Sequence, residues 1–262
     1  LSSIPAITAE DLRAFAETQL ARDRLYVAVS GDITAEELAP LLDQVFGALP
    51  EAAPENGIED ITVQNPGTIS LYERGDIPQT VIKAIQPGVA RGDPDYYTTL
   101  VMNYILGGGG FGSRLMDEAR EKRGLTYGIY THLYNLDHIK TVSLGTSTQN
   151  STAGEMLDII RAEFAGMRES PVSDKELEDA KSYLSGSMPL QLTSTDRIAR
   201  LLLSLQIDGL PIDYLDSRDE KIAAVTAQDI LKLSKTLLHP DGLTFVLVGK
   251  PEGVEVTNTV TE

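Results

Sequence analysis

The chain contains no cysteine and no tryptophan among its 262 residues, and it has only three histidines. Without cysteine there are no disulfides, thiol nucleophiles or thiolate metal sites. No stretch approaches the roughly 20 apolar residues that a membrane span requires, so we expect no membrane-spanning segment. The apolar fraction of 42% is normal for a folded globular protein and allows a sizeable core.

Positive charge is scarce: 22 Lys and Arg stand against 39 Asp and Glu, which gives a formal net charge of −17. Nucleic acids and anionic membrane surfaces are themselves negative and would be repelled. We therefore expect neither of them as a main partner. An acidic surface of this kind commonly confers solubility, and by itself it identifies no other partner.

The three histidines, His132, His138 and His239, are too dispersed for a metal site. No two of them lie beside a glutamate at the spacing of a helical zinc motif. His132 and His138 flank a hairpin turn expected at residues 135–137, and His239 precedes a proline after a helix. We expect each to lie at the surface or at a helix end, and we expect no metal to be bound by this chain.

The chain repeats itself at an offset of 218 residues, where residues 7–12 and 25–31 align without gaps on 225–230 and 243–249. In each copy a threonine precedes an amphipathic helix and an apolar strand ends at a glycine. The first-copy residues that meet an identical residue are Thr8, Ala9, Asp11, Thr18, Leu20, Asp23, Leu25 and Gly31. We interpret this as duplication, with chance similarity as the alternative.

Duplication predicts three parts along the chain. Residues 1–50 are the C-terminal remnant of a first module, residues 51–64 have the composition of a linker, and residues 65–262 form a complete second module. The remnant has lost the strands that would pair with it, and unpaired strand edges invite association. We therefore expect possible self-association through residues 1–50.

The order of elements in the second module predicts the fold class. Strands in hairpin-like pairs are followed by a group of helices, which favours an α+β fold with a largely antiparallel sheet and helices on one face. The expected strands are 67–72, 79–86, 125–131, 140–146 and 243–249. The expected helices are 94–105, 113–123, 152–167, 173–184, 193–207, a short one after these, and the repeated helix from 227.

Residues 106–127 combine glycines, cations and aromatic side chains more densely than any other stretch. Four consecutive glycines, residues 107–110, are expected to end the preceding helix in a loop, since glycine tolerates positive φ. Ser113 is expected to begin a second helix and Gly124 to end it. Arg120 in the last helical turn and Tyr127 early in the next strand are then expected to come together.

Four features occur together in this chain: a duplicated α+β architecture, a glycine-rich loop, the run Ser113, Arg114, Leu115, and the run from Arg120 to Tyr127. In this combination the chain resembles the pitrilysin/insulinase (inverzincin) family of zinc metallopeptidases. That family includes two-subunit bacterial peptidases and mitochondrial processing peptidases. Its zinc motif H-x-x-E-H lies on a helix of the first module, and an Arg and a Tyr seven residues apart in the second module face it across a closed chamber. The resemblance covers almost the whole chain and implies its C-terminal half or an inactive subunit.

The resemblance also implies roles for particular residues. Arg120 and Tyr127 have the family's spacing and would clamp the substrate and its oxyanion. The loop glycines Gly107, Gly108, Gly109, Gly110 and Gly112 would contact peptide substrate. The competing interpretations are a solvated charge for Arg120, a packed core aromatic for Tyr127, and a structural hinge for the glycines. A phosphate-binding loop is disfavoured because a helix, not a strand, precedes the glycines.

The function implied is the non-zinc half of a metalloendopeptidase, inactive alone, with zinc held in a partner module or subunit and unfolded peptide as substrate. The alternative is a catalytically inert scaffold or core subunit of a larger complex, because some members of the family are of that kind. A bacterial periplasmic or envelope location is favoured over the cytoplasm by the resemblance alone.

Overall fold

The computed structural model describes residues 3–55, 57–63 and 67–260. The chain divides into two compact units. The first unit spans Leu1–Ile58 and Met188–Tyr214, and the second spans Glu59–Ser187 and Leu215–Glu262. This division reflects spatial contacts within the chain, whereas the module boundaries predicted at residues 50 and 64 describe an evolutionary duplication. Residue 64 also lies outside the described residues. The predicted module boundaries therefore stay predictions.

Helices dominate the first unit. It contains α1 (Ala9–Gln19), α2 (Ala35–Phe46) and α7 (Thr195–Ile207). Thr8 and Thr34 each accept a hydrogen bond from the backbone N–H three residues later, and the carboxylate at that later position accepts from the threonine N–H, so both helices begin with a capping box. These local bonds explain why α1 begins directly after Thr8, as the sequence predicts.

The strand predicted at residues 25–31 does not form in the described part of the first unit, so that expectation is wrong for this chain. Its aligned copy is β5 (Thr244–Gly249), which lies between β2 and β1 in a sheet. A strand needs neighbouring strands to pair with its N–H and C=O groups, and no described residue of the first unit forms a strand beside residues 25–31. The apolar sequence therefore stays in an irregular conformation.

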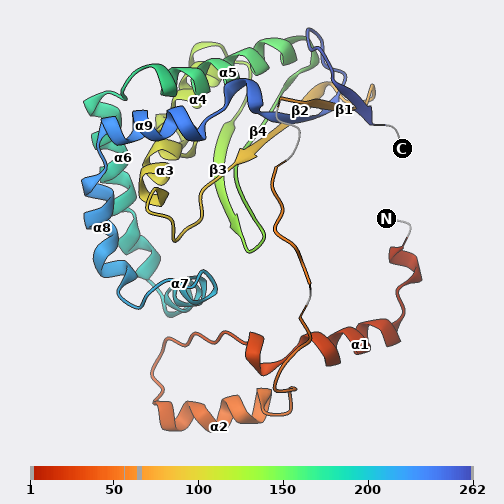
Figure 1. Ribbon diagram of the computed structural model, residues 1–262, viewed down its shortest axis with the longest axis vertical. Helices are drawn as coiled ribbons and strands as arrows, with labels where there is room; N and C mark the ends of the chain where they lie inside the picture. The colour runs from red at the N-terminus through yellow and green to blue at the C-terminus, as the bar shows by residue number, and fades with distance from the viewer. Residues whose placement is uncertain (1–2, 56, 64–66, 261–262) are drawn as a thin grey trace. The chain divides into compact units, whose positions relative to one another are not determined.

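The second unit is built on a six-stranded sheet in the order β3-β4-β2-β5-β1-β6 (Figure 1). The pairs β3–β4, β4–β2 and β2–β5 are antiparallel, while β1 runs parallel to β5 and β6, which confirms the largely antiparallel α+β fold. The strand bounds are β1 (Ile69–Glu73), β2 (Gln79–Pro87), β3 (Ile129–Leu136), β4 (Ile139–Gln149), β5 (Thr244–Gly249) and β6 (Asn258–Val260).

Helices cover one face of this sheet. Along β2, buried Ile82 and Ala84 alternate with exposed Val81 and Lys83, so one face packs against the core and the other does not. Figure 1 shows the helices of the second unit gathered on one side of the sheet. Their bounds are α3 (Tyr96–Asn103), α4 (Arg114–Met116), α5 (Ala153–Glu169), α6 (Asp174–Gly186), α8 (Tyr214–Ala224) and α9 (Ala227–Leu237).

The core lies between the sheet and these helices. Fully buried side chains from α3, α4, α5 and β5 meet there, among them Met102, Leu115, Phe164 and Phe245. None of the described helices is both long and apolar enough to cross a bilayer. The segment between α3 and β3 is packed into this core through buried side chains such as Leu106, Leu115 and Met116.

Several predicted boundaries are displaced, among them those of the helix before residues 106–127 and of the strand after Gly124. The helix expected from Pro94 begins two residues later, at Tyr96, with Asp95 as its N-terminal flanking residue. The strand expected from Leu125 begins at Ile129 and continues to Leu136. It begins late because the Thr126 side chain forms hydrogen bonds with the backbone of Gly128. The Thr126 hydroxyl accepts the N–H of Gly128 at 3.1 Å and donates to the carbonyl of Gly128 at 3.0 Å.

We predict self-association through the first unit, because its apolar side chains are poorly covered. Buried apolar side chains in its described part are confined to Ala21, Leu205 and Tyr214, whereas Leu12 and Phe15 of α1 are about two-thirds exposed, at 62% and 65%. Light scattering at high concentration should give a mass above that of the monomer. The Phe15→Glu variant should lower that mass.

The matched control is Arg13→Glu, which places the same side chain on another face of α1. It should leave the mass unchanged. A strict monomer at high concentration, or an equal effect of the two variants, would contradict the prediction.

Candidate functional site

The site expected from the sequence lies in the second unit, in the segment that joins α3 to β3. Helix α3 continues into a π-helical turn at Tyr104–Gly108, and a short 3-10 turn follows at Gly110–Gly112. Helix α4 then leads into a second π-helical turn at Asp117–Lys122, which contains Arg120. Such turns are rare and are frequent at functional sites.

The prediction that the glycine run ends the helix is wrong in part. Gly107 and Gly108 are helical, and the chain leaves the helix only after them. Within residues 107–112 a positive φ occurs only at Gly110, where it is +58°. The glycines are therefore needed mainly for a reason other than backbone freedom.

That reason is close packing at the first three glycines. A Cβ on Gly107 would lie 2.7 Å from the hydroxyl of Thr131 in β3 and 3.0 Å from a methyl of Leu115. A Cβ on Gly108 or Gly109 would meet residues of α3 and its π-helical turn below 3.0 Å. Gly110 and Gly112, in contrast, border open space.

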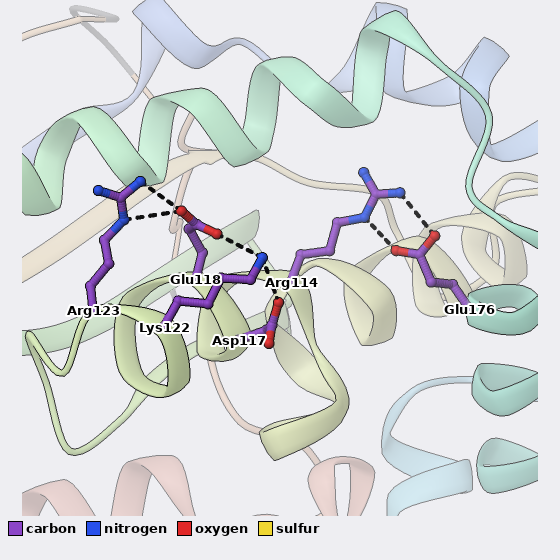
Figure 2. A network of polar contacts seen from close by, with 6 residues as sticks. All are labelled: Arg114, Asp117, Glu118, Lys122, Arg123 and Glu176. Carbon is purple, nitrogen blue, oxygen red and sulfur yellow. Dashed lines mark hydrogen bonds and ion pairs between the residues drawn. The ribbon is translucent and has the colours of Figure 1, made fainter.

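The predicted helix start at Ser113 is confirmed, although its side chain does not cap the helix in the usual way. The Ser113 hydroxyl instead donates to the carbonyl of Gly110 at 2.7 Å, which closes the 3-10 turn. The next residue, Arg114, donates two hydrogen bonds to Glu176 of α6, at 2.6 and 3.0 Å (Figure 2). This bidentate pair attaches α4 to α6.

Glu176 carries two structural tasks at once. It completes the capping box of α6 with Ser173, and it accepts both bonds from Arg114. Burial raises the pKa of Glu176, but the hydrogen bonds from Arg114 and Ser173 outweigh it and lower the pKa to about 2. A cavity of about 370 Å³ lies beside the pair, lined in part by Tyr104, Phe111 and Asp179.

Two further cations of this segment are neutralised by carboxylates. Lys122 lies 2.9 Å from Asp117 and 3.0 Å from Glu118, and Arg123 lies 2.7 Å from Glu118 (Figure 2). Arg123 also pairs with Glu155 of α5 at 3.2 Å. These side chains are engaged in holding the segment together.

Arg120 differs from its neighbours. Its Nε lies 3.6 Å from a carboxylate oxygen of Glu121, beyond hydrogen-bonding distance, and its side chain is 32% exposed. Its guanidinium also lies over the ring of Phe111, whose centroid is 4.4 Å from Cζ. In the described part of the chain, its donors make no hydrogen bond within the protein.

Tyr127 lies in the short connection between Gly124 and β3, and its side chain is 87% exposed. The interpretation of Tyr127 as a packed core aromatic is therefore wrong. The strand in which Tyr127 was expected has not yet begun at this residue. Among the described residues no hydrogen bond or cation–π contact joins Arg120 to Tyr127, so their expected meeting is not seen in the free chain.

Phe111 and Glu176 have roles in the structure that their local sequence does not indicate. The motif Ser173-x-x-Glu176 is a capping-box signal and marks Glu176 as a helix-start residue, but nothing local pairs it with Arg114, 62 positions away. Phe111 lies within the glycine run, and only its folded position reveals the contact with Arg120.

The three histidines do not form a cluster. His138 lies in the β3–β4 turn, 3.1 Å from Asp60, and His132 lies on the exposed side of β3. Within residues 3–55, 57–63 and 67–260 there is no cluster of three or more His, Asp or Glu side chains suited to a metal ion.

Residues 6–184 match the family described as the peptidase M16 inactive domain. The chain belongs to the peptidase M16 family. The predicted resemblance to zinc metallopeptidases of the pitrilysin/insulinase type is thereby confirmed at the level of the family. The internal duplication stays a prediction.

Solved and curated relatives of this M16 chain agree with the match. A crystal structure described as a peptidase M16 inactive domain from Pseudomonas fluorescens has a TM-score of 0.84 and 31% identity, covering 99% of this chain and 61% of that one. An uncharacterized zinc protease of Streptomyces coelicolor is 28% identical over 91% of this chain. A protein of Helicobacter pylori named a non-peptidase homolog is 26% identical over 94% of this chain. The chain spans about half the length of these two curated relatives, 53% and 56%.

We predict that Gly107→Ala destabilises the chain, because the added methyl would overlap Thr131 and Leu115, which are both fully buried. Overpacking of this kind costs about 1 to 3 kcal/mol of unfolding free energy. Urea denaturation measures it. The control is Gly112→Ala, which faces open space and should change stability by less than about 0.5 kcal/mol. Equal stability of the two variants would contradict the packing role of Gly107.

We predict that the Arg114–Glu176 pair makes the unfolding free energy depend on pH. The pKa of Glu176 is about 2 in the folded chain against an ordinary 4.5, so its contribution is complete above the ordinary value and is lost as pH falls toward 2. Arg114→Met should cost about 1 to 3 kcal/mol at pH 7 and less at pH 3. Urea denaturation at both pH values measures the difference.

The control is Arg123→Met, whose ion pairs are more exposed and should contribute about 0 to 1 kcal/mol. If Arg114→Met costs no more than this control, or costs the same at pH 3 and pH 7, the pair does not have the role assigned to it.

Proposed function

We propose that this chain is the non-zinc, substrate-clamping half of a metalloendopeptidase of the pitrilysin/insulinase type. The observation that carries the proposal is that the hydrogen-bond donors of Arg120 and Tyr127 are not used within the described part of the chain. Both lie on one short segment at the family's seven-residue spacing, and both expose donors that no described residue occupies. Neighbouring Arg114, Lys122 and Arg123 are engaged by carboxylates instead.

Peptide hydrolysis needs such donors. A zinc ion in the partner half would supply the activated water that attacks the scissile carbonyl. The carbonyl oxygen then gains negative charge, and preorganised donors aimed at it stabilise the transition state by about 3 to 4 kcal/mol each where water is excluded. The Arg120 guanidinium offers a fork of N–H donors with a permanent charge, and the Tyr127 hydroxyl offers one O–H.

The separation of Arg120 and Tyr127 in the free chain is compatible with this role. Catalytic hydrogen bonds are often absent before substrate binds and tighten only in the complex. Tyr127 is flanked by Gly124 at φ +64° and by Gly128, so its connection to β3 has backbone freedom. The bound peptide would supply the oxygen that brings the two donors together.

The glycine-rich loop would take part unequally in peptide binding. Gly110 and Gly112 border open space and are the members suited to contact an extended peptide backbone. Gly107, Gly108 and Gly109 are occupied by packing within the second unit. The proposed substrate is an unfolded peptide or a small protein, the proposed partner is a zinc-bearing module or subunit, and the proposed location is the bacterial periplasm or envelope.

A catalytically inert scaffold is the second candidate. It is supported by the relative from Helicobacter pylori, which is named a non-peptidase homolog. The two functions are separated by the zinc-bearing half: an H-x-x-E-H motif upstream in the same protein or in a neighbouring reading frame supports the peptidase, and its absence from both supports the scaffold.

We predict that, in the assembly with the zinc-bearing half, Tyr127→Phe lowers kcat by on the order of 10² to 10³ while leaving stability nearly unchanged. The substitution removes one hydroxyl from an exposed ring. Arg120→Ala should lower kcat comparably and also raise KM, because the guanidinium carries a permanent charge. If both groups hold one oxygen, the double variant should lose less than the product of the single effects. Steady-state kinetics on a peptide substrate measures all three.

The matched control is Arg123→Ala, whose guanidinium is engaged by Glu118 and Glu155. It should keep near wild-type kcat. Full kcat in Tyr127→Phe, or equal damage from Arg123→Ala and Arg120→Ala, would overturn the assignment of the clamp.

A further inference from the structure

The loop between α3 and α4 has a fixed half and a free half. Gly107, Gly108 and Gly109 are held by contacts that leave no room for a side chain. Beyond them, Phe111 stands between Gly110 and Gly112, both of which border open space. Its ring is therefore carried at the tip of the loop, where it is 64% exposed.

An exposed aromatic side chain at such a tip needs a partner to hold it. The ring of Phe111 has one in the guanidinium of Arg120, with Cζ 4.4 Å from the ring centroid. This distance is well inside the roughly 6 Å range of a cation–π contact. The tip of the loop and the second π-helical turn are thereby joined through these two side chains.

The type of contact decides what remains available on Arg120. A carboxylate partner would accept hydrogen bonds from the guanidinium and cancel its charge, as Glu176 does for Arg114 and Glu118 does for Arg123 (Figure 2). An aromatic face attracts the cation through the ring quadrupole and accepts none of its five N–H donors. The Glu121 carboxylate lies 3.6 Å from the Arg120 Nε, too far to accept a hydrogen bond. Arg120 is thus oriented by the ring while its donors are retained.

We infer that Phe111 is a positioning residue, which holds the Arg120 guanidinium ready to bind the carbonyl oxygen of a peptide without occupying its hydrogen-bond donors. The inference rests on the proposed function of Arg120. A long side chain that is already restricted loses less conformational entropy when it binds, so the contact raises kcat without touching the substrate. The contact serves binding because it leaves the donors unused.

The first test reads the contact directly in the chain alone, by nuclear magnetic resonance of the arginine Nε–H groups. The Arg120 signal is assigned by its disappearance in Arg120→Lys. In the wild type it should be displaced by the ring current of Phe111. It should move to the position of an exposed arginine in Phe111→Leu and stay displaced in Phe111→Tyr. The control is Tyr134→Leu, which removes an exposed aromatic ring from β3 and should leave the Arg120 signal unchanged.

The second test reads the consequence in the assembly with the zinc-bearing half. Phe111→Leu should lower kcat by about two- to fivefold, the range expected for an exposed cation–π contact, with little change in KM. Phe111→Tyr should restore wild-type kcat. In the Arg120→Ala background Phe111→Leu should have no further effect, because the ring acts through the guanidinium.

The outcomes separate the inference from the proposed function. An Arg120 signal that is unchanged in Phe111→Leu overturns the inference, whatever the kinetics show. A multiplicative effect of Phe111→Leu and Arg120→Ala also overturns it, because Phe111 would then act independently. Full kcat in Arg120→Ala overturns the proposed function and the catalytic consequence of the contact together, while a displaced resonance still supports the contact itself.

Discussion

The close approach of the first π-helical turn to β3 is the constraint on which the site depends. Gly107 lies against Thr131 and Leu115 with no space for a methyl group, so the turn, the strand and α4 share one tightly packed contact. Protein cores tolerate added volume poorly, which makes this contact a fixed point. The loop tip, the second π-helical turn and the connection that carries Tyr127 all project from it.

Charge pairing then distinguishes one cation from the rest. Arg114 is held by Glu176, and Lys122 and Arg123 are held by Glu118 and its neighbours. These ion pairs fix the segment to α6 and α5 but use up the donors that a substrate would need. Arg120 lies over an aromatic ring, and with its nearby Glu121 carboxylate at 3.6 Å it forms no ion-pair hydrogen bond and keeps its donors. The same segment thus contains both structural cations and one available for binding, and the difference lies in their partners.

Two stretches that align in sequence have different structures in the two units. Residues 25–31 align with β5, yet they form no strand, and the apolar residues of α1 remain exposed. In the second unit the equivalent strand pairs on both sides and its inward residues, such as Phe245, are fully buried. Strand formation depends on neighbours more than on local preference, so similar apolar stretches have different structures in the two units.

The sequence by itself determined the elements whose signals are local: the two repeated helices, from residues 9 and 227, each of which follows a threonine, the end of the helical segment near Gly124, and the largely antiparallel α+β class. Capping boxes and hydrophobic alternation act within a few residues, so they can be recognised without the fold. Tertiary structure alone decided the helical state of Gly107, the late start of β3, the exposure of Tyr127 and the partners of Arg114 and Arg120. Each of these depends on atoms far apart in the sequence or on the space left by neighbouring elements, and no local pattern encodes either.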